Sequence, residues 1–174
     1  FEKTIIMKNL SVTCIGAGVI GSGWAARLLV NGINVNVFDK RPESYNRTRL
    51  SVERAKKYFS QLTKAPPREM GSLTFEKSLE GALKTSTYII ESLPENLQIK
   101  RKLYKEIEQI SNNSIILSST SGFKPTDLQK HMKNPQNLLV THPFNPVYLM
   151  PLVEVVPGQE RDQNIVDDVQ HLLE

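Results

Sequence analysis

His142 and Glu154 are the residues of this chain best suited to acid–base chemistry. A histidine ring exchanges protons near neutral pH, and a neighbouring carboxylate can orient it and stabilise its charged form. Glu154 is the only acid between His142 and Gly158, and it interrupts an otherwise apolar run. We therefore expect Glu154 to be partly buried and to pair with His142. The alternative is that His142 is a core histidine without a catalytic role.

Further polar residues follow apolar segments at the points where strands are expected to end. They are Glu95 and Lys100 after 88–91, Ser121 after 115–117, and His142 and Asn145 after 138–141. Ligands of doubly wound sheets bind at the carboxyl ends of strands. Each residue alone has an ordinary structural explanation; for example, an acid such as Glu95 suits the start of a helix. Their recurrence at successive strand ends favours a functional site, with Ser121 and Asn145 as hydrogen-bond donors to a substrate oxygen.

A glycine-rich turn lies near the start of the chain. Gly16, Gly18 and Gly21 have the spacing G-x-G-x-x-G, after a β-prone segment and before a helical one. The first glycine permits the tight turn, the second lets a pyrophosphate approach the backbone, and the third lets the helix pack close to the sheet. We expect the phosphates of a dinucleotide at this helix N-terminus, beside Val19 and Ile20. The alternative is a strand–turn–helix corner that binds nothing.

Asp39 closes the next expected strand, where a carboxylate would accept hydrogen bonds from the ribose hydroxyls of adenosine. A carboxylate repels a 2′-phosphate, so Asp39 favours NAD over NADP as the cofactor. Lys40 and Arg41 could soften this preference, although we expect them to be a solvated pair. With NAD bound, the expected chemistry is alcohol oxidation: His142 takes the hydroxyl proton while a hydride leaves for the nicotinamide.

Alternating strands and helices predict an α/β fold, namely a Rossmann-type, doubly wound, mostly parallel sheet with helices on both faces. The expected strands are 11–15, 33–38, 72–75, 88–91, 115–117, 138–141 and 152–156. The expected helices are one that carries 25–30, then 43–62, 76–83, 95–110, 125–132 and 161–173. Residues 1–9 are expected to be a leader before the first strand, and Pro66-Pro67 a break.

Composition excludes several classes of protein. The chain has 174 residues with 39% hydrophobic residues, enough for one domain with a core. It has no apolar run near the ~20 residues of a membrane span. Its net charge of +4 comes from basic residues spread over expected helices, Lys100 among them, which is typical of solvated faces rather than of a nucleic-acid site. Cys14 is the only cysteine, so no disulfide can form within the chain, which fits a cytoplasmic protein. We also expect no metal site.

These motifs resemble the NAD-binding domain of the 3-hydroxyacyl-CoA dehydrogenase superfamily. The segments that carry the resemblance are GAGVIGSGWAARLL, ES-PENL-IK, SSTSGF and HPFNPVYLMPLVEVV. Within the superfamily the chain is most similar to the branch that acts on L-carnitine, through SSTSGFKPTDLQ and THPFNPVYLMPLVE. Acyl-CoA enzymes more typically have an aromatic residue where Pro143 stands. The gulonate dehydrogenase branch usually has valine at Phe144.

The resemblance implies NAD-dependent oxidation of the 3-hydroxyl of L-carnitine to 3-dehydrocarnitine. It makes His142 the general base and Glu154 its partner, and gives Ser121 and Asn145 contacts to the substrate oxygen or the nicotinamide. The positions implied on the cofactor side are Gly16, Gly18, Val19, Ile20, Gly21, Asp39, Glu95 and Lys100. The close alternative is 3-hydroxyacyl-CoA oxidation, in which Lys56 and Lys57 could meet the phosphates of CoA.

The resemblance also implies a following helical domain that completes the substrate site and builds a homodimer. We expect that domain to be absent from this chain, which would then be one portion of a longer protein. The trimethylammonium group of carnitine needs an aromatic face or a carboxylate. Phe123, Phe144 and Tyr148 are candidates, although core packing is the commoner explanation for such residues, and the cage could lie wholly in the other domain.

Two other classes of function remain open. One is a cofactor-binding protein without turnover, against which the presence of both His142 and Glu154 argues. The other is a hydrolase that uses Ser121, His142 and Glu154. The chain lacks a G-x-S-x-G elbow at Ser121, and a hydrolase would leave the glycine-rich turn unexplained.

Overall fold

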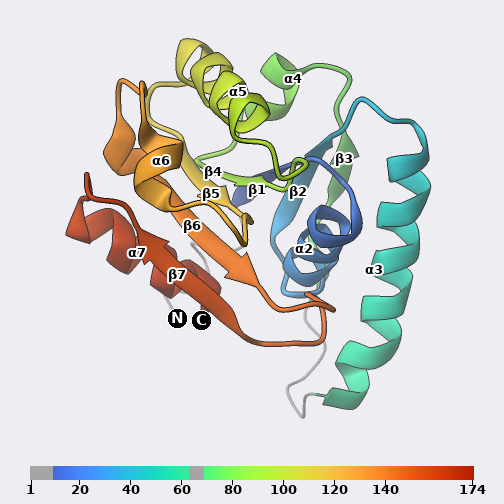
Figure 1. The fold of residues 1–174 in the computed structure, drawn as a ribbon. Helices are drawn as coiled ribbons and strands as arrows, with labels where there is room; N and C mark the ends of the chain where they lie inside the picture. Colours follow the sequence, from blue (N-terminus) through green and yellow to red (C-terminus); the bar gives the residue numbers. More distant parts are fainter. Residues whose placement is uncertain (1–9, 63–68) are drawn as a thin grey trace.

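Seven strands form a single sheet in the computed structural model, which describes residues 10–62 and 69–174 (Figure 1). The strands lie in the order β3-β2-β1-β4-β5-β6-β7, and only β7 is antiparallel to its neighbour. Their bounds are β1 Ser11–Ile15, β2 Asn34–Phe38, β3 Leu73–Phe75, β4 Tyr88–Glu91, β5 Ile115–Ser118, β6 Leu138–Pro143 and β7 Val153–Pro157. The expected Rossmann-type, mostly parallel sheet is confirmed.

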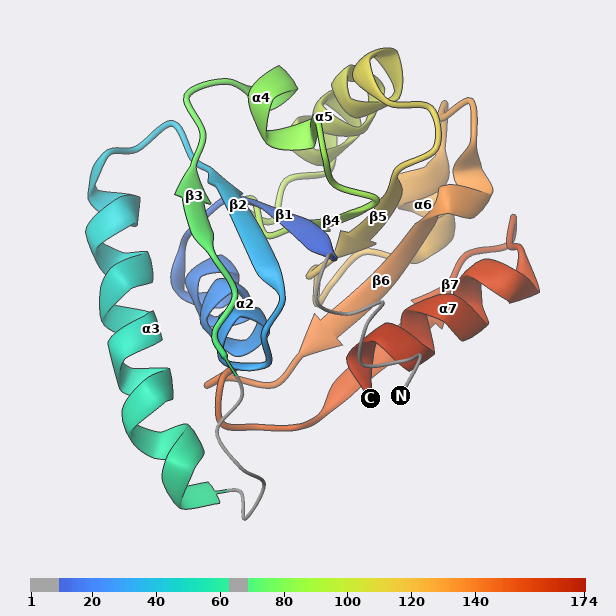
Figure 2. The same ribbon diagram turned by 180° about the vertical axis from the view of Figure 1, so that it is seen from behind.

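Helices cover both faces of this sheet. Side chains from alternate strand positions point to opposite faces, and each face packs against its helices in a separate core cluster. The helices packed into the first cluster are α2 (Val19–Val30), α3 (Glu43–Leu62) and α7 (Gln163–Leu173). Those packed into the second are α4 (Leu79–Leu83), α5 (Leu97–Ile110) and α6 (Pro125–Gln129). A short 3₁₀ turn, η1 (Pro135–Asn137), precedes β6. Figure 2 shows the same arrangement from behind, with α2 and α3 together and α4 and α5 grouped apart from them.

Side-chain caps set the starts of three helices that begin later than expected. Ser78, Asn96 and Asp162 each accept a hydrogen bond from a backbone N–H of the first turn, so α4, α5 and α7 begin at the next residue. Helix α6 ends at Gln129, before His131 takes a positive φ of 73°. The expected leader at 1–9 and the break at Pro66-Pro67 lie outside the described residues.

The direction of the chain through the sheet reverses between β1 and β4. From β1 the chain moves outward through β2 and β3, then returns to add β4 on the other side of β1. The crevice at the carboxyl ends of two such strands is where doubly wound sheets bind ligands. The backbone N–H of Ser92 donates to the carbonyl of Ile15 (2.8 Å), which joins the two strand ends below this crevice.

Neither a membrane span nor a metal site is found in the described part of the chain. No helix there is both long enough and apolar enough to cross a bilayer. Nor do three or more His, Cys, Asp or Glu side chains gather there in a way that could hold a metal ion.

Candidate active site

The three glycines of the turn after β1 have different structural roles. Gly16 has a φ of +82°, and a Cβ there would lie 2.7 Å from the carbonyl oxygen of Ser92. A Cβ on Gly21 would lie 1.8 Å from the carbonyl oxygen of Gly16. By contrast, a Cβ on Gly18 would meet nothing within 4 Å. The fold therefore requires glycine at the first and third positions, whereas Gly18 opens onto free space that a ligand can fill.

Helix α2 presents its N-terminus to that space. Gly18 is its N-cap residue, no side chain caps the terminus, and the first turn holds no acid. Val19 is 62% exposed, and Ile20 is partly buried. An uncapped helix start offers backbone N–H groups and the positive end of the helix dipole to an anion. These residues therefore fit the pyrophosphate of a dinucleotide.

Asp39 lies directly after β2 and is bound to the same turn. Its Oδ2 accepts a hydrogen bond from the backbone N–H of Ala17 (2.7 Å). Arg41 donates from Nε to Oδ1 (3.1 Å) and from Nη2 to Oδ2 (2.8 Å). Lys40 and Arg41 are both exposed, as expected for a solvated pair, but Arg41 is also bound to Asp39. Partial burial alone would raise the pKa of Asp39, but the hydrogen bonds from Arg41 and Ala17 outweigh it and lower that pKa.

Glu95 connects the end of β4 to the turn after β5. Its Oε1 accepts hydrogen bonds from the backbone N–H of Gly122 (2.9 Å) and from the hydroxyl of Thr120. Partial burial would raise the pKa of Glu95, but these hydrogen bonds and the nearby Lys100 charge lower it. The side chain is 42% exposed, so a fixed carboxylate faces the solvent beside Ser121.

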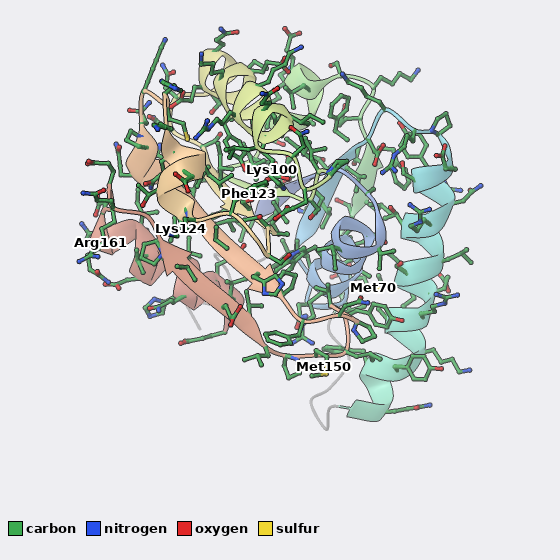
Figure 3. All side chains as sticks on the ribbon, viewed as in Figure 1. Met70, Lys100, Phe123, Lys124, Met150 and Arg161 are labelled. Atoms are coloured by element: carbon green, nitrogen blue, oxygen red, sulfur yellow. The ribbon has the colours of Figure 1, made fainter. Side chains whose placement is uncertain are left out.

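Lys100 was expected on a solvated helix face, and that prediction is wrong. Lys100 lies on the buried face of α5 and is only 1% exposed (Lys100 is marked in Figure 3). Its Nζ lies 2.7 Å from Oε1 of Glu91 and 3.5 Å from Oε2 of Glu95. A charged side chain at this depth needs such partners, because burial removes its water. The structure thus places the Lys100 charge directly behind the Glu95 carboxylate.

Glu91 is a buried acid that sequence reasoning missed. Its Oε1 accepts from Lys100 and from the backbone N–H of Leu93 (2.7 Å), and its Oε2 accepts from the hydroxyls of Tyr104 (2.6 Å) and Ser118 (2.7 Å). Burial, followed by the Glu91 charge, raises the pKa of Tyr104 well above its usual value. The available signal was a single charged residue in an otherwise uncharged strand, Tyr88–Glu91.

Trp24 forms a second contact that the sequence did not reveal. Its Nε1–H donates to the hydroxyl of Ser119 (3.1 Å), which also lies 3.1 Å from the hydroxyl of Ser92. This chain of three side chains joins α2 to the ends of β4 and β5. It fixes the glycine-rich helix relative to the two polar turns that carry Glu95 and Ser121.

His142 and Glu154 face each other across β6 and β7, in direct register. The Nδ1 of His142 lies 2.9 Å from Oε2 of Glu154, so the expected pairing is present. The expected partial burial of Glu154 is wrong, because its side chain is 57% exposed and that of His142 is 30% exposed. The face of β7 that carries Glu154 and Val156 is exposed, whereas Val153 on the other face packs against the core.

Ser121 and Asn145 are both exposed in the turns that follow β5 and β6. Phe144 is 38% exposed, and the centroid of its ring lies 5.7 Å from that of His142. Phe123 and Tyr148 instead pack against the core clusters on opposite faces of the sheet. Of the three aromatic candidates, Phe144 is thus the one in ring contact with the proposed base.

Lys56 and Lys57 both lie exposed on α3. The Nζ of Lys56 pairs with Glu53 (3.1 Å), and the Nζ of Lys57 lies 5.6 Å from the ring centroid of Tyr58. These contacts are ordinary for a surface helix.

The sequence of this chain is similar to those of known NAD-binding domains and dehydrogenases. The family model described as "3-hydroxyacyl-CoA dehydrogenase, NAD binding domain" matches residues 11–174. The L-carnitine dehydrogenase of Mesorhizobium japonicum is 46% identical over 148 residues, which cover 84% of this chain and 41% of that protein. The L-carnitine dehydrogenase of Oceanobacillus iheyensis is 45% identical over 162 residues, covering 92% and 52%. The chain thus spans about half the length of these relatives.

Among solved structures, the fold matches that of 5-formyl-3-hydroxy-2-methylpyridine 4-carboxylic acid 5-dehydrogenase, described as an NAD+-dependent dismutase. The TM-score is 0.86 at 30% sequence identity, and the match covers 94% of this chain and 53% of that one.

Proposed function

Because this chain belongs to the 3-hydroxyacyl-CoA dehydrogenase family, whose NAD-binding domain it matches, we propose that it serves an NAD-dependent oxidation of L-carnitine to 3-dehydrocarnitine. The observation that carries the proposal is the His142–Glu154 pair at 2.9 Å, at the end of a strand in the sheet that also carries the dinucleotide turn. The relatives named L-carnitine dehydrogenase support the choice of substrate.

His142 acts as the general base in this proposal. Its Nδ1 faces Glu154, which leaves Nε2 to take the proton of the substrate hydroxyl. The ring becomes positively charged in that step, and the carboxylate of Glu154 stabilises the charge and holds the ring orientation. NAD, when bound, supplies the acceptor for the hydride. Because Glu154 is exposed, the proton can pass on to solvent.

The remaining polar residues bind and position. Ser121 and Asn145 donate hydrogen bonds to the substrate oxygen or the nicotinamide, and Asp39 accepts them from the adenosine ribose. Glu95 holds the cofactor side of the site, with Lys100 acting through it. The phosphates lie against the turn and first helical residues: Gly16, Gly18, Val19, Ile20 and Gly21.

The rest of the substrate site belongs, in this proposal, to a second, helical domain of the longer protein, which also forms a homodimer. Phe144 supplies one aromatic face for the trimethylammonium group, since it is exposed beside His142. The alternative substrate is a 3-hydroxyacyl-CoA, favoured by the family's name and by the two exposed lysines of α3, Lys56 and Lys57.

The test is NADH formation by the full-length protein, followed by absorbance, with L-carnitine and 3-hydroxybutyryl-CoA in parallel. D-carnitine is the matched control, since it has the same groups in the opposite configuration. The expected result is turnover of L-carnitine alone. Turnover of the CoA ester alone would show that the substrate is a 3-hydroxyacyl-CoA, with the proposed mechanism retained. Turnover of neither compound would contradict the proposal.

A further inference from the structure

Arg41 covers the carboxylate that is proposed to bind the ribose. Its Nε and Nη2 donate to the two oxygens of Asp39 in a bidentate pair, and the backbone N–H groups of Arg41 and Ala17 complete four hydrogen bonds. The Asp39 side chain is only 5% exposed in this arrangement. A ribose hydroxyl therefore reaches the carboxylate only after the guanidinium has moved.

The structure permits that movement while keeping Arg41 at the site. The Arg41 side chain is 52% exposed, so it can turn toward solvent without leaving a cavity. Its backbone is held at both ends, by its N–H on Asp39 and by its carbonyl, which accepts hydrogen bonds from the backbone N–H (3.1 Å) and hydroxyl (2.5 Å) of Ser44. A displaced guanidinium thus remains beside the ribose that displaced it.

We propose that Arg41 is a specificity residue for the 2′ position of the adenosine ribose, so that this site accepts NADP(H) as well as NAD(H). A guanidinium binds phosphate oxygens in a fork of charge-assisted hydrogen bonds. It also offsets the repulsion that a lone carboxylate would exert on a 2′-phosphate. The inference rests on the dinucleotide site of the proposed function and adds a second cofactor class to it.

The other charges near Arg41 set the expected size of the effect. The carboxylate of Asp39 remains in place, and Glu43 adds a second negative charge close to Arg41. Both oppose a 2′-phosphate, so NAD(H) stays the preferred ligand. The ratio of the two dissociation constants is the quantity that Arg41 controls.

The test is an equilibrium titration of the full chain with NADH and with NADPH, followed by nicotinamide fluorescence. Arg41→Met keeps the length of the side chain and removes the guanidinium. It should raise the Kd of NADPH about tenfold, and leave that of NADH within about threefold. Lys40→Met is the matched control, because it removes the same charge from the exposed neighbouring residue and should leave the ratio unchanged.

A second variant tests the same contact from the other side. Asp39→Ser releases Arg41, so NADPH should bind about tenfold more tightly and NADH more weakly, and adding Arg41→Met should abolish the gain. Circular dichroism checks that each variant is folded.

Three results would overturn the inference: equal effects of Arg41→Met and Lys40→Met, an Asp39→Ser variant that binds NADPH no better, or a wild-type chain that binds NADH but not NADPH. The last would leave the proposed function standing, whereas binding of neither dinucleotide would overturn both.

Discussion

Lys100 and Glu91 form an ion pair with Nζ and Oε1 2.7 Å apart, and their side chains are 1% and 0% exposed. This pair lies directly behind Glu95, whose Oε2 is 3.5 Å from the same Nζ. The exposed carboxylate of the site is therefore held from inside the domain. The position of the Glu95 carboxylate depends on the buried charges of Lys100 and Glu91, which solvent does not screen.

Replacing Lys100 with Met should lower the free energy of unfolding by about 3–5 kcal/mol, because Glu91 is left buried without a counter-ion. Chemical denaturation at neutral pH measures the change. Lys102→Met, on the exposed side of α5, is the control and should change stability by less than about 0.5 kcal/mol. Adding Glu91→Gln to Lys100→Met should restore part of the loss; additive losses would refute the coupling.

Gly18 and Gly21 should respond differently to alanine. A Cβ at Gly18 meets nothing within 4 Å, so Gly18→Ala should change the free energy of unfolding by less than about 0.5 kcal/mol. It should nevertheless weaken NADH binding about tenfold, since the methyl group enters the space left for the pyrophosphate. Gly21→Ala should instead cost at least about 1–3 kcal/mol, because its Cβ would overlap the Gly16 carbonyl. Denaturation and NADH titration of both variants separate these effects; equal losses of stability would contradict the assignment.

His142→Asn should reduce kcat of the full-length protein by about 10²–10⁴-fold, the usual contribution of a general base. NADH binding should stay unchanged, because the substitution leaves the glycine-rich turn intact. His171→Asn provides the control, since His171 is exposed on α7 and contacts the carbonyl of Asp167. Full activity of His142→Asn would exclude His142 as the catalytic base.

Cys14 should be inert in the folded protein. It is 0% exposed in β1, and burial raises the pKa of its thiol to about 12, so almost no reactive thiolate forms at neutral pH. A chromogenic thiol reagent should label the native chain only as fast as the protein unfolds, and should find one thiol per chain in denaturant. Rapid labelling of the native protein would contradict this placement.

The fold was largely predictable because its signals are local. The helix Glu43–Leu62 and the strands Ser11–Ile15 and Tyr88–Glu91 have the bounds that their residue patterns predict. Differences of a few residues arise where a capping side chain, such as Asn96, sets the helix start. The pairing of His142 with Glu154 was also predictable, since one acid follows the histidine in a short stretch of chain.

The support of the site was not predictable, because its partners come from different elements of the fold. Trp24 bonds to Ser119 across 95 positions, and nothing in either local sequence indicates the other. The burial of Lys100 depends on Glu91, which lies on a different element. The exposure of Glu154 was predicted wrongly because an apolar run does not reveal which face of an edge strand is covered.

The antiparallel pairing of β6 with β7 separates the proposed chemistry from the proposed recognition of substrate. His142 and Glu154 occupy one rung of a strand ladder, so main-chain hydrogen bonds set their spacing. The connecting segment, in contrast, places Phe144, Met150 and Leu152 on the surface (Met150 is marked in Figure 3). Changes in the length or sequence of that segment can therefore alter the surface beside His142 without moving the rung that holds the proposed His142–Glu154 pair.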